Sequence, residues 1–410
     1  METRPPKRAR ASCSPWPALP PDIAGEVLLR LRSYADRICF GAVCRPWRRC
    51  AAQHPLLPRL PCLVFAHGTF RGFPGDDRPF RLPAAAGYYG SSGEWLIFRR
   101  DDGTYTLANP FSNATAVAPL PSLSSVRARR EPVGAVDGEG DVPEYDVQGL
   151  VLRELPVGGE PEPRTVSLRK LVVCSPDLVA AVIGEGRLGT FALCRPGAAS
   201  WSVSSHDQWR RLKDMAVHQG ELYAVDHNED LLVVTVGEDS DGAPRVTGVG
   251  RVIEGAPPDL AMHRRVTLHY LVDSGDALLM MRREVCLARP PGRGRDLDER
   301  LTVFKADFRS SRWATVSTLG DGVALFVGPW CSRAVRVPDD ERREEWAGRV
   351  FFLEDGASQE RQLLQWSQRY SLSAYDVTSR RTHSVLPAVR TRDGDELPAT
   401  WLFPPDHVRA

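Results

Sequence analysis

The sequence lacks several features that define whole classes of protein. Its nine cysteines include no Cys-x-x-Cys pair and follow no regular spacing, so neither a zinc site nor a disulfide framework is expected. Its longest apolar run, residues 178–183, is far short of the ~20 residues that a membrane span needs. The first residues lack the apolar core of a secretory signal. We therefore expect an intracellular protein, in the nucleus or the cytoplasm, with no membrane partner.

The chain also lacks an excess of charge and the common catalytic motifs. Lys and Arg number 53 against 52 Asp and Glu, so no overall field attracts nucleic acid. No Walker loop or Gly-x-Ser-x-Gly elbow is present, and the closest histidines flanking a predicted strand, His263 and His269, have no acidic or cysteine partner at ligand spacing. Residues 239–242 begin like a calcium loop, but no downstream glutamate follows, which favours a hairpin turn. We expect no catalysis, no cofactor and no metal.

Helical periodicity is confined to the region that follows a basic tail. Residues 1–15 are basic and rich in proline, and they predict a disordered tail. Ile23, Val27, Leu28 and Leu31 then recur at the spacing of one helix face, with Asp22 in the N-cap region. Two further short helices are predicted, one near 38–43 and one from residue 44, whose Cys44 and Cys50 we expect in the core. The result is a small all-α bundle over 16–55.

The residues of this bundle resemble an F-box. Leu19-Pro20, the apolar positions of the first helix and the closing Val43-Cys44-Arg45-x-Trp47-Arg48 match that family's pattern in order and spacing. The resemblance implies docking on the Skp adaptor of an SCF ubiquitin ligase, and through it on cullin and RING subunits. We expect Leu19 and Pro20 to contact the adaptor more than they pack in the helical core, and we expect Trp47 and Val43 to pack in that core. The candidate adaptor-binding residues are Leu19, Pro20, Ile23, Val27, Leu28, Leu31, Val43 and Trp47.

After a linker at 56–61 the pattern changes to short β-type runs separated by Gly, Asp, Asn and Pro. Most neighbouring runs are two to six residues apart, which predicts hairpins. A weak repeat follows pairs of strands with a returning segment that carries Trp or Pro, as at 194–203 and 307–316. The irregular spacing between these returns suits four-stranded units. The sequence therefore predicts an all-β propeller over 62–405, of six or seven blades. We expect Trp401-Leu402-Phe403 to close the ring by pairing with the N-terminal blade.

The phrases of this region resemble the KIB-type propeller that follows an F-box in a large family of plant proteins. The matching features are the Asn-Pro…Leu-Pro return at 109–121, the strand near Lys170, the Cys-Arg-Pro-Gly…Trp phrase at 194–201, the Asp…Trp phrase at 307–313 and the Trp-Leu-Phe-Pro ending at 401–404. Trp201, Trp313 and Trp401 are expected to pack between blades.

Together these resemblances imply a non-catalytic substrate-recognition subunit of an SCF ligase, whose propeller binds an unknown target protein. The alternative is a scaffold or inhibitor outside any ligase, for example of a kinase. A propeller enzyme would need ionisable groups converging at the central channel, and no motif shows them. Recognition is expected in the insertions 127–146, 288–299 and 338–346, on the rim away from the linker.

Overall fold

The protein is described here from a computed structural model. The described residues are 19–31, 34–53, 61–72, 79–110, 117–123, 126–127, 166–185, 188–203, 210–255, 265–286, 299–337, 343–353, 372–386 and 399–403. The predicted tail at 1–15, most of the linker and most of the three predicted insertions lie outside these residues.

Three short helices precede the sheets: α1 (Pro21–Arg30), α2 (Tyr34–Val43) and α3 (Arg45–Gln53). Pro21 suits the first helical position because its missing N–H needs no partner there, and Asp22 in the first turn favours the positive end of the helix dipole. Asp22 is thus in the helix, and Pro20 holds the N-cap position. At the other end of α1, the Leu31 amide donates to Val27 O and Leu28 O, both at 3.2 Å.

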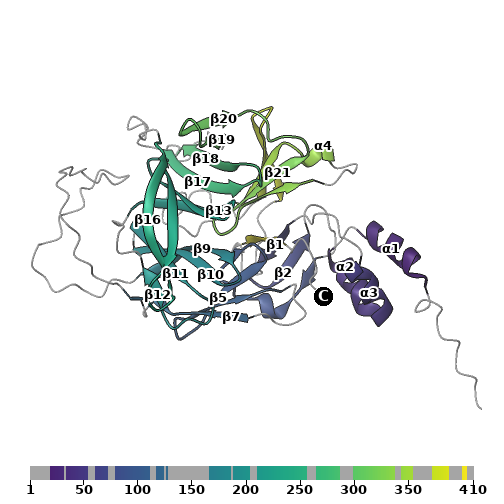
Figure 1. The fold of residues 1–410 in the computed structure, drawn as a ribbon. Helices are drawn as coiled ribbons and strands as arrows, with labels where there is room; N and C mark the ends of the chain where they lie inside the picture. The colour runs from purple at the N-terminus through teal and green to yellow at the C-terminus, as the bar shows by residue number, and fades with distance from the viewer. Residues whose placement is uncertain are drawn as a thin grey trace, which may run out of the picture.

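Six mainly antiparallel sheets form a six-bladed β-propeller, as the sequence predicted (Figure 1). Blade 1 contains β26 (Ala399–Leu402), β1 (Cys62–Phe65), β2 (Thr69–Gly72) and β3 (Phe80–Arg81); blade 2 contains β4 (Gly90–Ser92), β5 (Trp95–Arg99), β6 (Tyr105–Ala108) and β7 (Val117–Leu120). Blade 3 contains β9 (Ser167–Ser175), β10 (Leu178–Glu185), β11 (Leu188–Cys194), β12 (Trp201–Val203) and β8 (Val126–Arg127).

The remaining blades follow in chain order. Blade 4 contains β13 (Leu212–His218), β14 (Glu221–Asp226), β15 (Leu231–Glu238) and β16 (Pro244–Ile253); blade 5 contains β17 (Arg265–Asp273), β18 (Leu278–Cys286), β19 (Glu299–Asp307) and β20 (Arg312–Val316). Blade 6 contains β21 (Val323–Val327), β22 (Arg333–Arg336), β23 (Arg349–Leu353), β24 (Leu372–Asp376) and β25 (Arg381–Leu386). A 3-10 turn, η2 (Pro83–Ala85), and a short helix, α4 (Arg343–Trp346), complete the structure.

The ring closes where the sequence predicted. β26, from the C-terminal end of the chain, pairs antiparallel with β1, with Cys62 opposite Leu402 and Leu63 opposite Trp401. On the other side of β26, the hydroxyls of Ser91 and Thr400 lie 2.6 Å apart and Ser91 also donates to Trp401 O. Because every residue of β26 is buried, this strand joins blade 1 to both of its neighbours.

Two blades depart from the four-stranded pattern. In blade 3 the short strand β8 adds in parallel to β12 and covers the outer edge of the sheet. In blade 6, β21 pairs in parallel with β23, while β22 folds back along the other side of β21. The return from β21 to β22, residues 328–332, crosses the middle of the ring, where it bonds to residues of blades 2 and 3.

Candidate functional site

The apolar residues of α1 lie on two different faces of the helix. Ala24 and Leu28 are buried in the helical core, against which Leu31 packs. Ile23 and Val27 are 50% and 36% exposed. The predicted single face is therefore wrong for Ile23 and Val27, because the residues that meet the other helices stand one position later in each turn. A small Ala24 side chain allows that close contact, which hydropathy spacing could not show.

The other two helices also separate core residues from exposed ones. Phe40 is buried and stacks on Trp47 with ring centroids 4.4 Å apart, as expected for a core role of Trp47. Val43 is 57% exposed, so the expectation that it serves the core is wrong. Cys50 is buried and burial raises the pKa of its thiol, whereas Cys44 is only half-buried.

The two residues before α1 differ from each other as well. Leu19 is half-buried and packs against the helical core, contrary to the expectation that it serves contact more than the core, whereas Pro20 is exposed. Among the described residues six large apolar side chains are exposed, and four of them belong to these helices: Ile23, Val27, Leu29 and Val43. Exposed apolar side chains concentrated on one small unit are candidates for an interaction surface. We call Pro20, Ile23, Val27 and Val43 the helical face.

The strands nearest the propeller axis are joined by a buried ion pair. The Lys170 ammonium on β9 lies 2.6 Å from the Asp214 carboxylate on β13, and both side chains are more than nine-tenths buried. Asp214 also accepts the backbone amides of Met215 and Leu271, each at 2.8 Å. Lys170 in turn donates to Pro329 O at 3.4 Å. This ion pair therefore links blades 3, 4, 5 and 6, because Asp214 also accepts a backbone amide of blade 5 and Lys170 donates to a backbone carbonyl of blade 6.

The return at 328–332 fills the ring from the blade 6 side. Trp330 lies edge-on to Tyr89 at 5.2 Å and packs against the core shared by blades 2 and 3. The next residue, Cys331, accepts the Gly93 amide on its sulfur at 3.2 Å, and burial raises the pKa of its thiol. Lys170, Asp214 and Cys331 are thus bonded to one another or to backbone groups of neighbouring blades.

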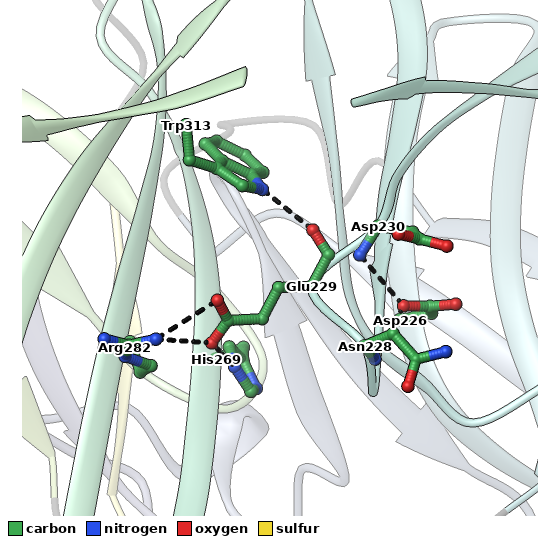
Figure 2. Close-up of polar contacts among 7 residues, drawn as sticks. All are labelled: Asp226, Asn228, Glu229, Asp230, His269, Arg282 and Trp313. Carbon is green, nitrogen blue, oxygen red and sulfur yellow. Dashed lines mark hydrogen bonds and ion pairs between the residues drawn. The ribbon is translucent and has the colours of Figure 1, made fainter. Parts of the chain in front are cut away.

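A second polar cluster joins blades 4 and 5 (Figure 2). Glu229, in the turn from β14 to β15 and at φ +65°, directs its carboxylate at His269 Nε2, 2.9 Å away, and accepts two bonds of 3.2 Å from Arg282. Its backbone carbonyl accepts the Trp313 indole N–H at 2.8 Å. The turn itself is held by Asp226, which accepts the amides of Asn228 and Asp230.

Opposing effects set the ionisation of these carboxylates. Burial alone would raise the pKa of Glu229. The hydrogen bond and charge of His269 and the charge of Arg282 lower this pKa by more than burial raises it, so the net pKa is below the ordinary value. Burial raises the pKa of Asp226, although the amides it accepts oppose that shift. Glu229 is therefore ionised at neutral pH and holds the two blades together. The sequence analysis left His269 without a partner, because Glu229 lies 40 residues away in the chain.

Three tryptophans connect neighbouring blades through their indole N–H groups. Trp201 donates to Pro121 O at 2.9 Å, from blade 3 to blade 2, and Trp401 donates to Val327 O at 3.0 Å, from blade 1 to blade 6. Trp313 makes the corresponding bond from blade 5 to Glu229 of blade 4. The predicted packing of these residues between blades is confirmed, because each Trp bonds its blade to the preceding blade of the ring.

Strand direction assigns the chain segments to the two rims of the ring. The front rim carries the turns between first and second strands, and Phe403 places the C-terminal end of β26 there by donating to Gly93 O at 2.9 Å. Cys62, opposite Leu402, is therefore on the front rim too, so the chain enters the propeller on that side. β18 and β22 each begin at a front-rim turn, so their C-terminal ends lie on the opposite, back rim. β8 runs parallel to β12, so its C-terminal end lies on the back rim as well.

The predicted recognition insertions consequently leave the propeller on the back rim. Arg127 begins the first, Cys286 precedes the second and Arg336 precedes the third, and all three stand at back-rim ends of strands. This is the rim away from the linker, as the sequence analysis expected. Target recognition by these segments remains a prediction, since they fall mostly outside the described residues.

The described residues also bear on metal binding, membrane spanning and the predicted calcium-like turn. Within the described ranges no group of three or more His, Cys, Asp or Glu side chains is arranged to hold a metal ion. None of the described helices is long and apolar enough to cross a membrane. The predicted turn at 239–242 is confirmed, since Asp239 accepts the amides of Asp241 and Ala243 and Gly242 has φ +74°.

Comparison with known families places the propeller. A family model described as the KIB1-4 beta-propeller matches residues 73–376, more than half of the chain. The chain belongs to the KIB1-4 β-propeller family. The KIB-type resemblance read from the sequence is thereby confirmed. The match begins after the helices, so it does not extend to the helical face of this KIB1-4 propeller protein.

Comparisons with individual proteins add little to this assignment. No curated protein matches the chain. The crystal structure of the tricorn protease is similar at a TM-score of 0.27 and 9% identity, over 83% of this chain and 33% of that one, so the chain spans about a third of that protein's length. A protein from Lactobacillus plantarum is similar at a TM-score of 0.24 and 11% identity, over 84% and 99% of the two chains.

Proposed function

We propose that this protein is the substrate-recognition subunit of an SCF-type ubiquitin ligase, with the helical face docking on a Skp adaptor and the propeller holding a target protein. The observation that carries the proposal is the division of residues within the helices. Ala24, Leu28, Phe40 and Cys50 form the helical core, while Pro20, Ile23, Val27 and Val43, all within the F-box-like pattern, stay exposed. A core that leaves these pattern positions outside is what an adaptor-binding surface requires.

The role proposed for the propeller is binding without catalysis. Its central charges are paired within the protein, and a propeller is a common scaffold for protein–protein interaction. The subunit would then act by holding target lysines near a charged conjugating enzyme, which raises their effective concentration. The second candidate is a scaffold or inhibitor outside any ligase, which would use the propeller and leave the helical face without an adaptor.

The test uses paired substitutions on α1 in the full chain. Ile23→Asp with Val27→Asp places charge on the helical face and should abolish co-purification with a Skp adaptor. Leu29→Asp is the matched control, because Leu29 is also exposed on α1 but points to another side of the helix and stands outside the F-box pattern. If the paired variant retains the adaptor at the wild-type level, the adaptor role is wrong and the scaffold reading replaces it.

A further inference from the structure

The outer strand of blade 4 has an unusually long free edge. β16 is ten residues long and, among the described residues, pairs only with β15. The outer strands β3, β7, β20 and β25 have two, four, five and six residues, and β8 covers the edge of blade 3. Figure 1 shows β16 at the periphery of the ring. One side of this strand therefore presents backbone N–H and C=O groups with no described hydrogen-bond partner, although the strand also packs against β11 and β12 of blade 3.

The middle of this edge carries none of the usual protective residues. Proteins normally guard sheet edges with lysine, proline or inward-pointing charge. Val246–Gly250 contains no charged residue and no proline, and Pro244 occurs only as the first residue of the strand. Gly248 and Gly250 have so much room that an added Cβ would meet nothing closer than 3.9 Å and 3.5 Å respectively. Thr247 and Gly250 are also exposed, and Gly248 and Val249 are half-buried, so the middle of the strand reaches the surface.

We propose that this edge binds an extended segment of a partner protein as an added β-strand. Register shifts in the β15–β16 pairing flank Gly248–Arg251, so only about four residues offer a regular template. That length is too short for a second copy of this chain, since a stable interface between two proteins buries about 1,200 Å² or more. It suits a short extended segment, whose main chain supplies most of the binding.

The charges at the two ends of the edge indicate the chemistry of that segment. Arg245 is half-buried at one end of the edge, and its Nε has no hydrogen-bond partner among the described residues. The Arg251 side chain is 52% exposed, and its pairs with Asp230 and Glu254 are long, at 3.4 Å and 3.6 Å. A segment with β-branched residues between two acidic ones would complement this edge. Such a segment could belong to the target protein of the proposed ligase subunit. The inference rests on the proposed function only for the identity of that target.

The test uses a synthetic probe, Ac-Glu-Val-Thr-Val-Thr-Val-Glu-amide with a fluorescent label, and the full chain. Fluorescence anisotropy should give saturable binding with a dissociation constant on the order of 100 µM, a free energy between the values for 1 mM and 1 µM. Hydrogen exchange should then show new protection at 246–251. The matched control probe has the same side chains with alternate amides N-methylated, so it cannot donate along one edge, and it should bind at least about tenfold more weakly.

A pair of protein variants completes the experiment. Gly250→Asp places a carboxylate on the edge and should weaken probe binding at least about fivefold, whereas Gly250→Ala, which fits the space, should bind as the wild type does. No binding at 1 mM probe, equal binding of the N-methylated probe, or protection outside β16 would each overturn the inference. Protection of β16 by self-association, seen with concentration and without probe, would also overturn it. Adaptor binding by the helical face, measured in parallel, distinguishes any of these failures from a failure of the proposed function.

Discussion

Replacing Trp401 tests how the ring is closed. Trp401 is fully buried on β26, and its indole N–H donates to Val327 O of blade 6. Trp401→Phe leaves that buried carbonyl without its donor, at a cost of about 1–3 kcal/mol, and the smaller ring adds about 1 kcal/mol through lost packing. The expected loss is about 2–4 kcal/mol, a large part of the ~5–15 kcal/mol that a domain typically has.

Urea denaturation of the full chain measures this effect. With a slope of about 3 kcal/mol/M, the midpoint should fall by about 1 M while the slope stays unchanged. Trp95→Phe is the matched control, because Trp95 is half-buried on β5 and its indole makes no hydrogen bond to another described residue. It should move the midpoint by less than a third as much. If Trp401→Phe stays within about 0.5 kcal/mol of the wild type, the indole bond does not hold blade 1 to blade 6.

The remaining predictions concern other parts of the ring. Because the Glu229 pKa in the folded chain lies below the ordinary 4.5, its ionised form stabilises the protein above pH 4.5 and this contribution is lost as pH falls through the folded-state pKa; Glu229→Gln should therefore lower the melting temperature at pH 7, with the gap to wild type narrowing below pH 4.5. Gly90→Ala would drive a Cβ into the Trp330 indole and should cost about 1–3 kcal/mol in urea melts, whereas Gly248→Ala, in open space, should be nearly neutral. Deleting residues 398–410 removes β26 and exposes the edge of β1, so light scattering should report aggregation; a soluble, cooperatively melting truncation would speak against closure by β26.

Local features of the fold could be predicted from the sequence because their causes are local. Turns such as Asp239–Gly242 follow from side chains that bond their own backbone. The closing role of Trp401 and the Trp-containing returns at Trp201 and Trp313 also appear in the sequence, since in each a Trp stands near the point where one blade meets the next. Six blades fall within the predicted six or seven.

Features that depend on distant parts of the chain were not predictable. Glu229 and His269, or Lys170 and Asp214, meet only because neighbouring blades bring their strands together. The central position of Trp330 follows from the folding back of β22, which no periodicity encodes. For the helices, spacing identified the apolar positions but not their direction. Ile23 and Val27 are exposed because Ala24 and Leu28 fit the neighbouring helices more closely.

The central claim is that the helical face, and not the propeller, meets the Skp adaptor. Hydrogen exchange of the full chain with and without purified adaptor tests it most directly, because amide protection locates the contact along the sequence. We expect a one-to-one complex with new protection confined to residues 19–53, lost in the Ile23→Asp, Val27→Asp variant and kept in Leu29→Asp. Protection on the propeller strands, or no complex at micromolar concentrations, would contradict it.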